Sequence, residues 1–245
     1  MNTKGNTMLI TGGTAGIGRA LLHRFYSLGN QLIVSSSNAE NLENLKLEFP
    51  NIETVVCDLA QEKEVYKLIE ICQQRFSTIN VLINNAGIQF NYDWKIEQEG
   101  LKKIKDEISV NFTSPMQLIY GLLPLLLQKP DAAIINVSSG LAFAPKKSAP
   151  VYCASKAAIH SVSKSLRYQL ENTSIKVFEI IPPLVDTAMT AGRGTGKITA
   201  EQLVDEFMNN FKNNKFESNI GKTKLLRFIQ RLSPKIADKI MKGGL

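Results

Sequence analysis

Features that the 245-residue sequence lacks narrow its class. Its three cysteines, Cys57, Cys72 and Cys153, form no CxxC pair, and their odd number gives no support for a disulfide framework. The two histidines, His23 and His160, fall in predicted helices without a cluster of other ligand-type residues, so surface or structural roles are expected. These observations predict a reduced, cytoplasmic protein with no metal site.

Long hydrophobic segments are also scarce. The N-terminus runs directly into an apolar strand pattern, without the charged region, long apolar stretch and cleavage site of an export signal. The most apolar run, residues 118–127, is about half of the roughly 20 residues that span a bilayer, and Pro124 interrupts it. We therefore expect a buried helix there. No linker or low-complexity stretch divides the chain, which predicts one domain over residues 1–245.

Positive charge is concentrated at the C-terminus. Of the net charge of +7, residues 221–245 contribute +6, and no basic stripe with interleaved aromatics indicates nucleic-acid binding. In this tail Leu225, Phe228, Ile229 and Leu232 repeat at one-turn spacing with basic residues between them. Such a basic amphipathic segment can pack on the body or on another subunit, or make weak peripheral contact with an anionic membrane. Packing is the favoured interpretation.

Short apolar runs alternate with helical patterns along the chain. They predict strands at residues 8–11, 31–35, 52–57, 80–84, 132–138 and 176–181, with a weaker signal at 216–220. Long helices are predicted over 97–128, with a break near Pro115, and over 152–172. Because continuous apolar strands are typical of parallel sheets covered on both sides, we predict an α/β fold. It is a Rossmann-type doubly wound parallel sheet of six or seven strands with helices on both faces.

A glycine-rich turn, TGGTAGIG, follows the first predicted strand. Glycines at this place permit a tight turn and close approach of a diphosphate, and the helix that follows presents free backbone amides to it. The position of the motif between the first strand and the first helix predicts dinucleotide binding.

Further motifs occur in a familiar order. The set TGGTAGIG, NNAG (84–87), SVN (109–111), NVSS (136–139) and YCASK (152–156) resembles the short-chain dehydrogenase/reductase family over about residues 7–190. Within that family, INVSSGLAFAP, PVYCASKAAIHS and PPLVDT resemble a bacterial subgroup labelled as oxidoreductases related to D-alanyl lipoteichoic acid metabolism. That label names no substrate.

The resemblance implies a set of coenzyme-binding residues: Gly12, Thr14, Gly16, Ile17, Gly18, Ser36, Ser37, Asp58, Leu59, Asn85, Ala86, Gly87, Tyr152, Lys156, Val185 and Thr187. Asn85 could instead serve only to tie loops together. Pro183 replaces the usual glycine of the family's PGxVxT stretch and makes the local geometry less secure. The second strand ends in Ser35–Asn38, with neither an acid for a ribose hydroxyl nor an arginine for a 2′-phosphate, and NADP(H) is slightly favoured over NAD(H).

Tyr152 and Lys156 are four residues apart, so they project from the same face of a helix. The resemblance implies that Tyr152 is the general acid/base, and we expect Lys156 and an oxidised nicotinamide to lower its pKa from about 10. Ser139, with Ser138 as the alternative, would hydrogen-bond the substrate oxygen. Asn111 would hold a water molecule that links Lys156 to solvent.

These residues predict an NAD(P)-dependent oxidoreductase that interconverts an alcohol and a carbonyl. The alternative is a dinucleotide-binding sensor or scaffold protein without turnover. The expected partners are a small-molecule alcohol or carbonyl substrate and identical subunits, in a homodimer or homotetramer formed through the long helices. Residues 190–215 could form a mobile lid over the substrate or a plain surface loop. Phe90 and Phe143 could wall an apolar pocket.

Overall fold

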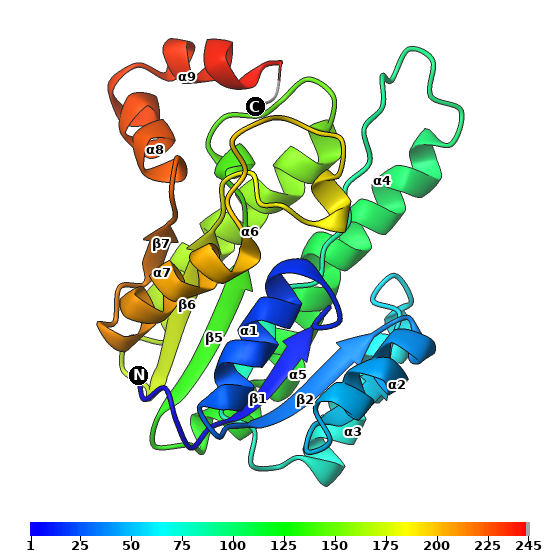
Figure 1. The fold of residues 1–245 in the computed structure, drawn as a ribbon, viewed down its shortest axis with the longest axis vertical. Helices are drawn as coiled ribbons and strands as arrows, with labels where there is room; N and C mark the ends of the chain where they lie inside the picture. The colour runs from blue at the N-terminus through cyan, green and yellow to red at the C-terminus, as the bar shows by residue number, and fades with distance from the viewer. Residues whose placement is uncertain (244–245) are drawn as a thin grey trace.

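A computed structural model describes residues 1–243 of the chain, and over these residues seven parallel strands form one sheet in the order β3-β2-β1-β4-β5-β6-β7 (Figure 1). The strands are β1 (Thr7–Thr11), β2 (Gln31–Ser36), β3 (Glu53–Val56), β4 (Val81–Asn84), β5 (Ala132–Val137), β6 (Ile175–Ile181) and β7 (Glu217–Asn219). The predicted doubly wound sheet is confirmed, and the weakly signalled segment at 216–220 contains its seventh strand.

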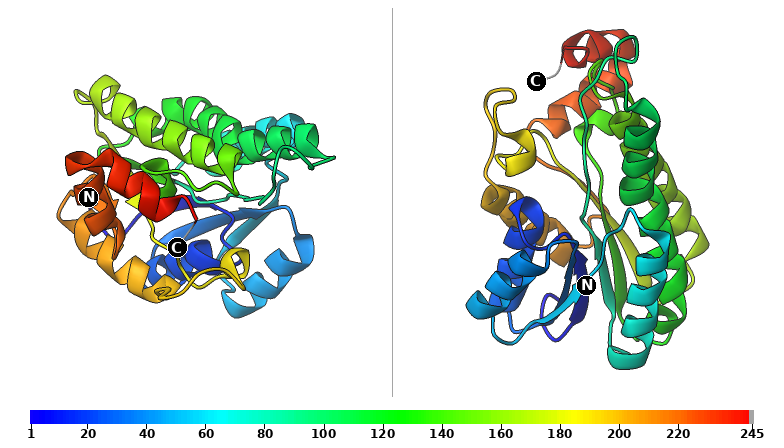
Figure 2. Two further views of the ribbon diagram at one scale, coloured as in Figure 1. Left: turned by 90° about the horizontal axis from the view of Figure 1, so that it is seen from above. Right: turned by 90° about the vertical axis from the view of Figure 1, so that its right-hand side faces the viewer.

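Helices cover both faces of the sheet because most of its strands are buried on both sides (Figure 2). One face packs against α1 (Gly16–Ser27), α2 (Ala39–Glu48) and α7 (Ala200–Lys212). The other face packs against α3 (Glu62–Arg75), α5 (Ser114–Leu127) and α6 (Pro150–Gln169). The order of strands reverses between β1 and β4, and in doubly wound sheets ligands bind beside such a point, at the carboxyl ends of the strands.

The long helix predicted over 97–128 consists of α4 (Gly100–Ile108), a π-helical turn (Ser109–Thr113) and α5. The π-helical turn lies just before Pro115, where the sequence predicted a break. The continuous helical stretch Gly100–Leu127 is long and apolar enough to cross a membrane by length and composition alone. Its residues Leu118, Leu122 and Leu126 are fully buried in the core, whereas Tyr120 and Leu127 are exposed, so the predicted buried helix is buried on one face only.

Helix α7 contributes to the core although it falls within the predicted lid. Leu203, Val204, Phe207 and Phe211 are all buried, and the Phe211 ring lies 4.8 Å from the ring of Phe178 in β6. These contacts assign residues 200–212 a packing role, because removing them would expose a large apolar surface. A movable cover over the substrate is thereby restricted to the preceding loop, residues 190–199, for which it stays a prediction.

The basic tail forms two short helices, α8 (Thr223–Leu232) and α9 (Pro234–Met241), above the carboxyl ends of the strands (Figure 1). Their inner side contributes Leu226, Ala237 and Met241 to a small apolar cluster with Ala144. The stripe that the sequence singled out lies mainly on the outer side, where Leu225, Phe228 and Leu232 are exposed. The favoured prediction of packing on the body is therefore confirmed for the inner side of the tail.

Candidate active site

The glycine-rich turn leaves no room for larger side chains. A Cβ atom on Gly12 would lie 2.9 Å from the Cα atom of Ala86, and one on Gly18 would lie 2.2 Å from the carbonyl oxygen of Gly12. Gly12 and Gly16 also have φ values of +64° and +52°, which L-residues with side chains rarely adopt. The turn therefore brings bare backbone to the start of α1, which is the arrangement that a diphosphate requires.

Asn85 fixes this turn from the end of β4. Its Nδ2 atom donates to the carbonyl oxygens of Thr11 and Gly12, each at 3.0 Å, and its backbone nitrogen donates to the Thr11 hydroxyl at 3.1 Å. The side-chain amide is thus committed to tying β1 to β4, the role that the sequence left as an alternative, although Asn85 also borders the cavity described next.

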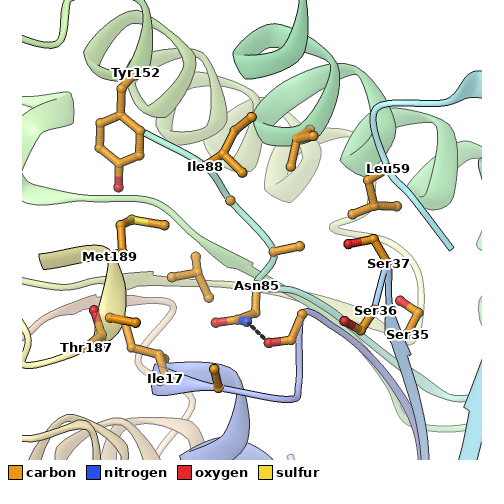
Figure 3. A pocket seen from close by; sticks show the side chains of 18 of the residues that line it. Ile17, Ser35, Ser36, Ser37, Leu59, Asn85, Ile88, Tyr152, Thr187 and Met189 are labelled. Carbon is orange, nitrogen blue, oxygen red and sulfur yellow. Dashed lines mark hydrogen bonds between the residues drawn. The ribbon is translucent and has the colours of Figure 1, made fainter. Parts of the chain in front are cut away.

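A cleft extends from this turn across the carboxyl ends of the strands (Figure 3). We call it the coenzyme cleft. The structure brings together most of the predicted coenzyme-binding residues along its walls: Gly12, Gly16, Ile17, Ser36, Ser37, Asp58, Leu59, Asn85, Ala86, Gly87, Tyr152, Lys156 and Thr187. Ser35, from the serine run at the end of β2, also lines it, as do Ile88 and Met189, which were not predicted. In Figure 3 the serines and Tyr152 lie toward opposite ends of the cleft.

Three predicted coenzyme-binding residues do not line the cleft. Gly18 lies beneath it, where its missing Cβ permits contact with the Gly12 carbonyl. Val185 is buried in the core and bridges to Ile198 instead. Thr14 is half-buried in the glycine turn but outside the cleft wall. Contact of these three residues with a coenzyme stays a prediction.

Asn111 lies behind the cleft rather than in its wall. It is buried in the π-helical turn, where its Oδ1 atom accepts from the backbone nitrogen of Ile88 and its Nδ2 atom donates to the Ile88 carbonyl, both at 2.8 Å. A Cβ atom on Gly87 would lie 3.2 Å from Asn111 Oδ1 and 3.4 Å from Lys156 Nζ. Asn111 therefore holds the strand-end loop beside Lys156, and its predicted water-holding role stays a prediction.

Tyr152 and Lys156 project from the first turns of α6 toward the cleft, as their spacing predicted. The Lys156 Nζ atom donates to the carbonyl oxygen of Val137 at 2.8 Å and lies 5.7 Å from the centre of the Tyr152 ring. Burial of Lys156 lowers its pKa to about 8, and Glu179 acts in the opposite direction.

Without coenzyme, the pKa of Tyr152 lies above its ordinary value, although Lys156 is nearby; the lowering expected from an oxidised nicotinamide stays a prediction. Burial raises the pKa of its phenol to about 12, although the nearby Ser139 hydroxyl has a lowering effect. Desolvation penalises the phenolate, and the Lys156 ammonium lies beside the ring, bound to the Val137 carbonyl. In the protein without coenzyme, the phenol is therefore a proton donor over the whole neutral range.

The two candidate serines have different surroundings. The Ser138 hydroxyl donates to the buried carboxylate of Glu179 at 2.5 Å, and the same carboxylate accepts from His160 Nδ1 at 2.9 Å. Ser139 lines a second cavity together with Tyr152, and its hydroxyl accepts from the backbone nitrogen of Leu141 at 3.1 Å. The geometry favours Ser139 for contact with a substrate. His160 has a structural contact, within the roles expected for it.

The second cavity, which we call the side pocket, adjoins the coenzyme cleft at Tyr152, Pro182 and Met189, which line both. Its other lining residues are Gln89, Ser139, Gly140, Leu141, Lys146, Pro183, Leu184, Thr190, Arg193, Lys222, Thr223, Leu226 and Met241. Figure 3 shows the Tyr152 hydroxyl directed toward Met189 at this junction. The basic residues of the pocket were not predicted, since they come from separate segments of the chain without a shared motif.

The predicted pocket wall of Phe90 and Phe143 is wrong for the cavities found. Neither residue lines the coenzyme cleft or the side pocket. The Phe143 ring stacks edge-on against His160, with ring centres 5.1 Å apart, and the Arg227 guanidinium lies 4.2 Å from its centre. Phe143 thus connects α6 to the C-terminal tail. The apolar side chains of the side pocket are mainly aliphatic.

Comparison with known proteins agrees with this site. The family model for short chain dehydrogenases matches residues 6–198. DltE of Bacillus subtilis (strain 168), named an uncharacterised oxidoreductase, is 42% identical over 223 residues, which cover 89% of this chain and 88% of that protein. The match agrees with the predicted resemblance to the bacterial subgroup.

Solved structures show the same fold. A short chain dehydrogenase from Burkholderia cenocepacia J2315 in complex with NADP has a TM-score of 0.87, with 23% identity, and the match covers 98% of this chain and 99% of that one. A short chain dehydrogenase/reductase from Burkholderia phymatum in complex with NAD has a TM-score of 0.80 at 20% identity, covering 95% and 96% of the two chains. With the glycine turn, the cleft and the family match in place, the chain belongs to the short-chain dehydrogenase/reductase family of NAD(P)-dependent oxidoreductases.

Proposed function

We propose that the protein interconverts an alcohol and a carbonyl, with Tyr152 as the general acid/base. The observation that carries this proposal is the position of Tyr152 at the junction of the coenzyme cleft and the side pocket. A substrate in the side pocket would place its reacting oxygen near the phenol, with the coenzyme on the other side. A proton donor at such a junction is what reduction of a carbonyl requires.

The cleft fits a nicotinamide dinucleotide, because Gly12 and Gly18 form a cradle that any Cβ atom would fill. When bound, the coenzyme supplies or accepts the hydride. The protein's own contribution is to the proton and to orientation. The protonated Tyr152 phenol gives a proton to the developing alkoxide, and Ser139 hydrogen-bonds the same oxygen. Lys156, held at the Val137 carbonyl, lines the cleft in which the coenzyme would bind and lies 5.7 Å from the centre of the phenol ring.

NADP(H) is the proposed coenzyme, by a narrow margin over NAD(H). Ser36 and Ser37 line the end of the cleft at β2, where their hydroxyls could hydrogen-bond a 2′-phosphate. No carboxylate side chain follows β2 before Glu40 in α2. Relatives of the fold bind either coenzyme: one solved structure holds NADP and another NAD.

Self-association through the long helices is part of the proposal. Leu101 in α4, Tyr120 in α5 and Tyr168 in α6 are large apolar side chains exposed on the same helical layer. Covering them would remove apolar surface from water, which favours a homodimer or homotetramer. Light scattering of the purified protein gives the mass directly, and a monomer at micromolar concentration would rule out this part of the proposal.

The outer side of the tail could add weak peripheral contact with an anionic membrane. Phe228 and Leu232 are 61% and 70% exposed, and Arg231 and Lys235 lie beside them in the chain. Flotation with vesicles that contain an anionic lipid tests this contact at low salt. If the protein does not float with the vesicles, membrane contact is ruled out and the tail only packs on the body through its inner side.

The general acid/base assignment is tested by Tyr152→Phe, which removes one hydroxyl and keeps the ring. Turnover on an alcohol and carbonyl panel should fall at least about 1000-fold, because proton transfer and the orientation of the oxygen are lost together. Coenzyme affinity, measured by titration with NADPH and NADH, should stay within about threefold, since the ring keeps its packing.

The same measurements separate the enzyme from a dinucleotide sensor or scaffold. Wild-type protein that binds coenzyme but turns over no member of a broad panel would favour the sensor. Unchanged turnover in Tyr152→Phe would show that another group moves the proton.

A further inference from the structure

The side pocket carries unpaired positive charge. Lys146, Arg193 and Lys222 line it from three separate segments of the chain, and no aspartate or glutamate within residues 1–243 lines it with them. None of the three forms an ion pair among the described residues, whereas the neighbouring Lys197 pairs with Asp186 at 3.2 Å. Lys146 and Arg193 are half-buried and Lys222 is exposed. Half-buried cations are normally paired, so the two unpaired cations Lys146 and Arg193 require an explanation.

Two of the cations converge on one point. With its amide oxygen turned toward them, Gln89 accepts from Lys146 Nζ at 2.6 Å and from Arg193 Nη1 at 3.2 Å. A single oxygen atom in this position thus lies within hydrogen-bonding distance of both groups. A neutral amide oxygen is a weak partner for two cations, and a carboxylate or phosphate oxygen would be a stronger one.

Lys222 approaches the same pocket from the start of α8. Its Nζ atom lies 2.6 Å from the place that a Cβ atom on Gly196 would occupy. Gly196 has a φ of +65°, so the glycine-rich loop both adopts a conformation that favours glycine and leaves space for the lysine amine. The loop that follows Thr190 thus supplies Arg193 to the pocket and lies against Lys222 at Gly196.

The surroundings do not neutralise these charges. Burial lowers the pKa of Lys146, and the positive charge of Arg193 lowers it further. Glu107 is an acid close enough to influence Tyr152, but its carboxylate accepts from the backbone nitrogen of Phe90 at 2.9 Å. A bound anion would relieve the repulsion between Lys146 and Arg193.

Apart from these cations, most of the pocket wall is aliphatic. It includes Leu141, Leu184, Leu226 and Met241. We propose that the side pocket binds an amphiphilic substrate whose acidic group, a carboxylate or phosphate, is held by Lys146 and Arg193 while an apolar segment lies along this wall. The inference rests on the proposed function, because it takes the reacting oxygen to lie at Tyr152. It narrows the substrate to an anionic alcohol or carbonyl compound.

Binding of three probes with the same carbon chain tests the inference without turnover. Octanoate, octyl phosphate and octanamide are titrated calorimetrically into the full chain, with and without NADPH. We expect one or both anions to bind at least about tenfold more tightly than the neutral amide, because a hydrogen bond to a charged group contributes about that factor. The anion that binds more tightly identifies the acidic group.

Variants of the pocket cations test which residues cause the preference for the anionic probe. Lys146→Ala and Arg193→Ala should each reduce the affinity of the preferred anion about tenfold and leave octanamide within about twofold. Lys147→Ala is the matched control, since Lys147 is exposed and outside the pocket wall and should change neither. Circular dichroism and thermal melting check that each variant is folded. Lys146→Arg should retain most of the preference, because it keeps the charge.

Three outcomes would overturn the inference. Octanamide could bind as tightly as both anions, none of the probes could bind, or the preference could persist in the Lys146→Ala and Arg193→Ala double variant. Failure of the proposed function is a separate result, since it appears as absent turnover or absent coenzyme binding while probe binding is measured independently.

Discussion

The coenzyme cleft and the side pocket meet at Tyr152 but are built by different means. The cleft is formed at the strand ends, and its diphosphate end is glycine backbone that tolerates no Cβ atom at Gly12 or Gly18. The side pocket is formed by loops and by the C-terminal tail, and its character comes from long side chains such as Lys146 and Arg193. The shape of the coenzyme cleft depends on backbone conformation at the glycine turn, whereas the character of the side pocket depends on the side chains that its loops contribute.

This contrast has a consequence for substitution. Backbone-built sites respond sharply to the addition of a single methyl group, because the sheet cannot move to make room for it. Sites built by side chains on loops lose individual contacts and keep the rest.

Gly18→Ala should produce the largest effect of these tests. The new Cβ would lie 2.2 Å from the Gly12 carbonyl oxygen and 2.4 Å from Asn85 Nδ2, so the turn must shift. We expect coenzyme affinity to fall more than about 100-fold, as misplaced amides lose hydrogen bonds to the diphosphate. Overpacking should also lower the free energy of unfolding by about 1–3 kcal/mol.

Gly100→Ala is the control for this change. A Cβ atom there would lie 3.7 Å from the nearest atom, Glu97 Cγ, in ordinary contact, and the residue begins a helix away from the cleft. Coenzyme titration and thermal melting of both variants measure whether the losses of affinity and stability are specific to Gly18→Ala. Gly18→Ala protein with wild-type affinity would show that the cradle adapts, contrary to a rigid backbone-built site.

Ser139→Ala tests the proposed hydrogen bond to the substrate oxygen where the two regions meet. Its turnover should fall about 100-fold, which is typical for removing one donor to a developing oxyanion. Ser138→Ala should reduce turnover less but cost about 1–3 kcal/mol of stability, because the buried Glu179 carboxylate loses a donor at 2.5 Å. Steady-state rates and denaturant unfolding distinguish the two effects. The reverse pattern would move the substrate contact to Ser138.

The same contrast determines what could be predicted from the sequence. The seven strands and the coenzyme cleft were predictable, since apolar runs, strand-end glycines and ordered motifs record local backbone requirements. The side pocket was not, because Lys146, Arg193 and Lys222 meet only through tertiary structure and share no spacing.

Two further features of the site depend on tertiary structure that the sequence does not reveal. Tyr152 and Lys156 lie as their spacing requires, yet the direction of the Tyr152 pKa shift depends on burial, which a spacing does not reveal. The amphipathic pattern of α7 predicted an apolar face correctly but not its partner, which is the core near Phe178 rather than a substrate.

The ionisation of Tyr152 tests whether burial controls the protonation state of the phenol where the coenzyme cleft meets the side pocket. Burial raises its pKa to about 12, so the coenzyme-free protein should form no phenolate at this residue below about pH 10, the ordinary value for tyrosine. Since only the protonated phenol can donate a proton, the rate of carbonyl reduction should not fall through deprotonation of Tyr152 between about pH 6 and 9. Alcohol oxidation needs the phenolate and should accelerate as pH rises.

Ultraviolet difference absorbance between wild type and Tyr152→Phe measures this phenolate. Saturation with oxidised coenzyme should lower the pKa by about one unit or more, because its positive charge stabilises a nearby phenolate. Reduced coenzyme, which lacks that charge, is the control. A Tyr152 that ionises near neutral pH without coenzyme would show that Lys156 outweighs burial.

Ser37→Asp should have the smallest effect, at the end of the cleft that side chains rather than backbone define. A carboxylate there would repel a 2′-phosphate and accept from a ribose hydroxyl, so NADPH affinity should fall about tenfold while NADH stays within about twofold. Asn38→Asp adds the same charge one residue later, where the side chain accepts from the Asn41 nitrogen at the start of α2. That control should leave both affinities nearly unchanged, since its carboxylate is held at the helix end. Equal losses of NADPH and NADH in Ser37→Asp would mean that the serine contacts a part common to both coenzymes, and the preference for NADP(H) would then have to come from elsewhere in the cleft.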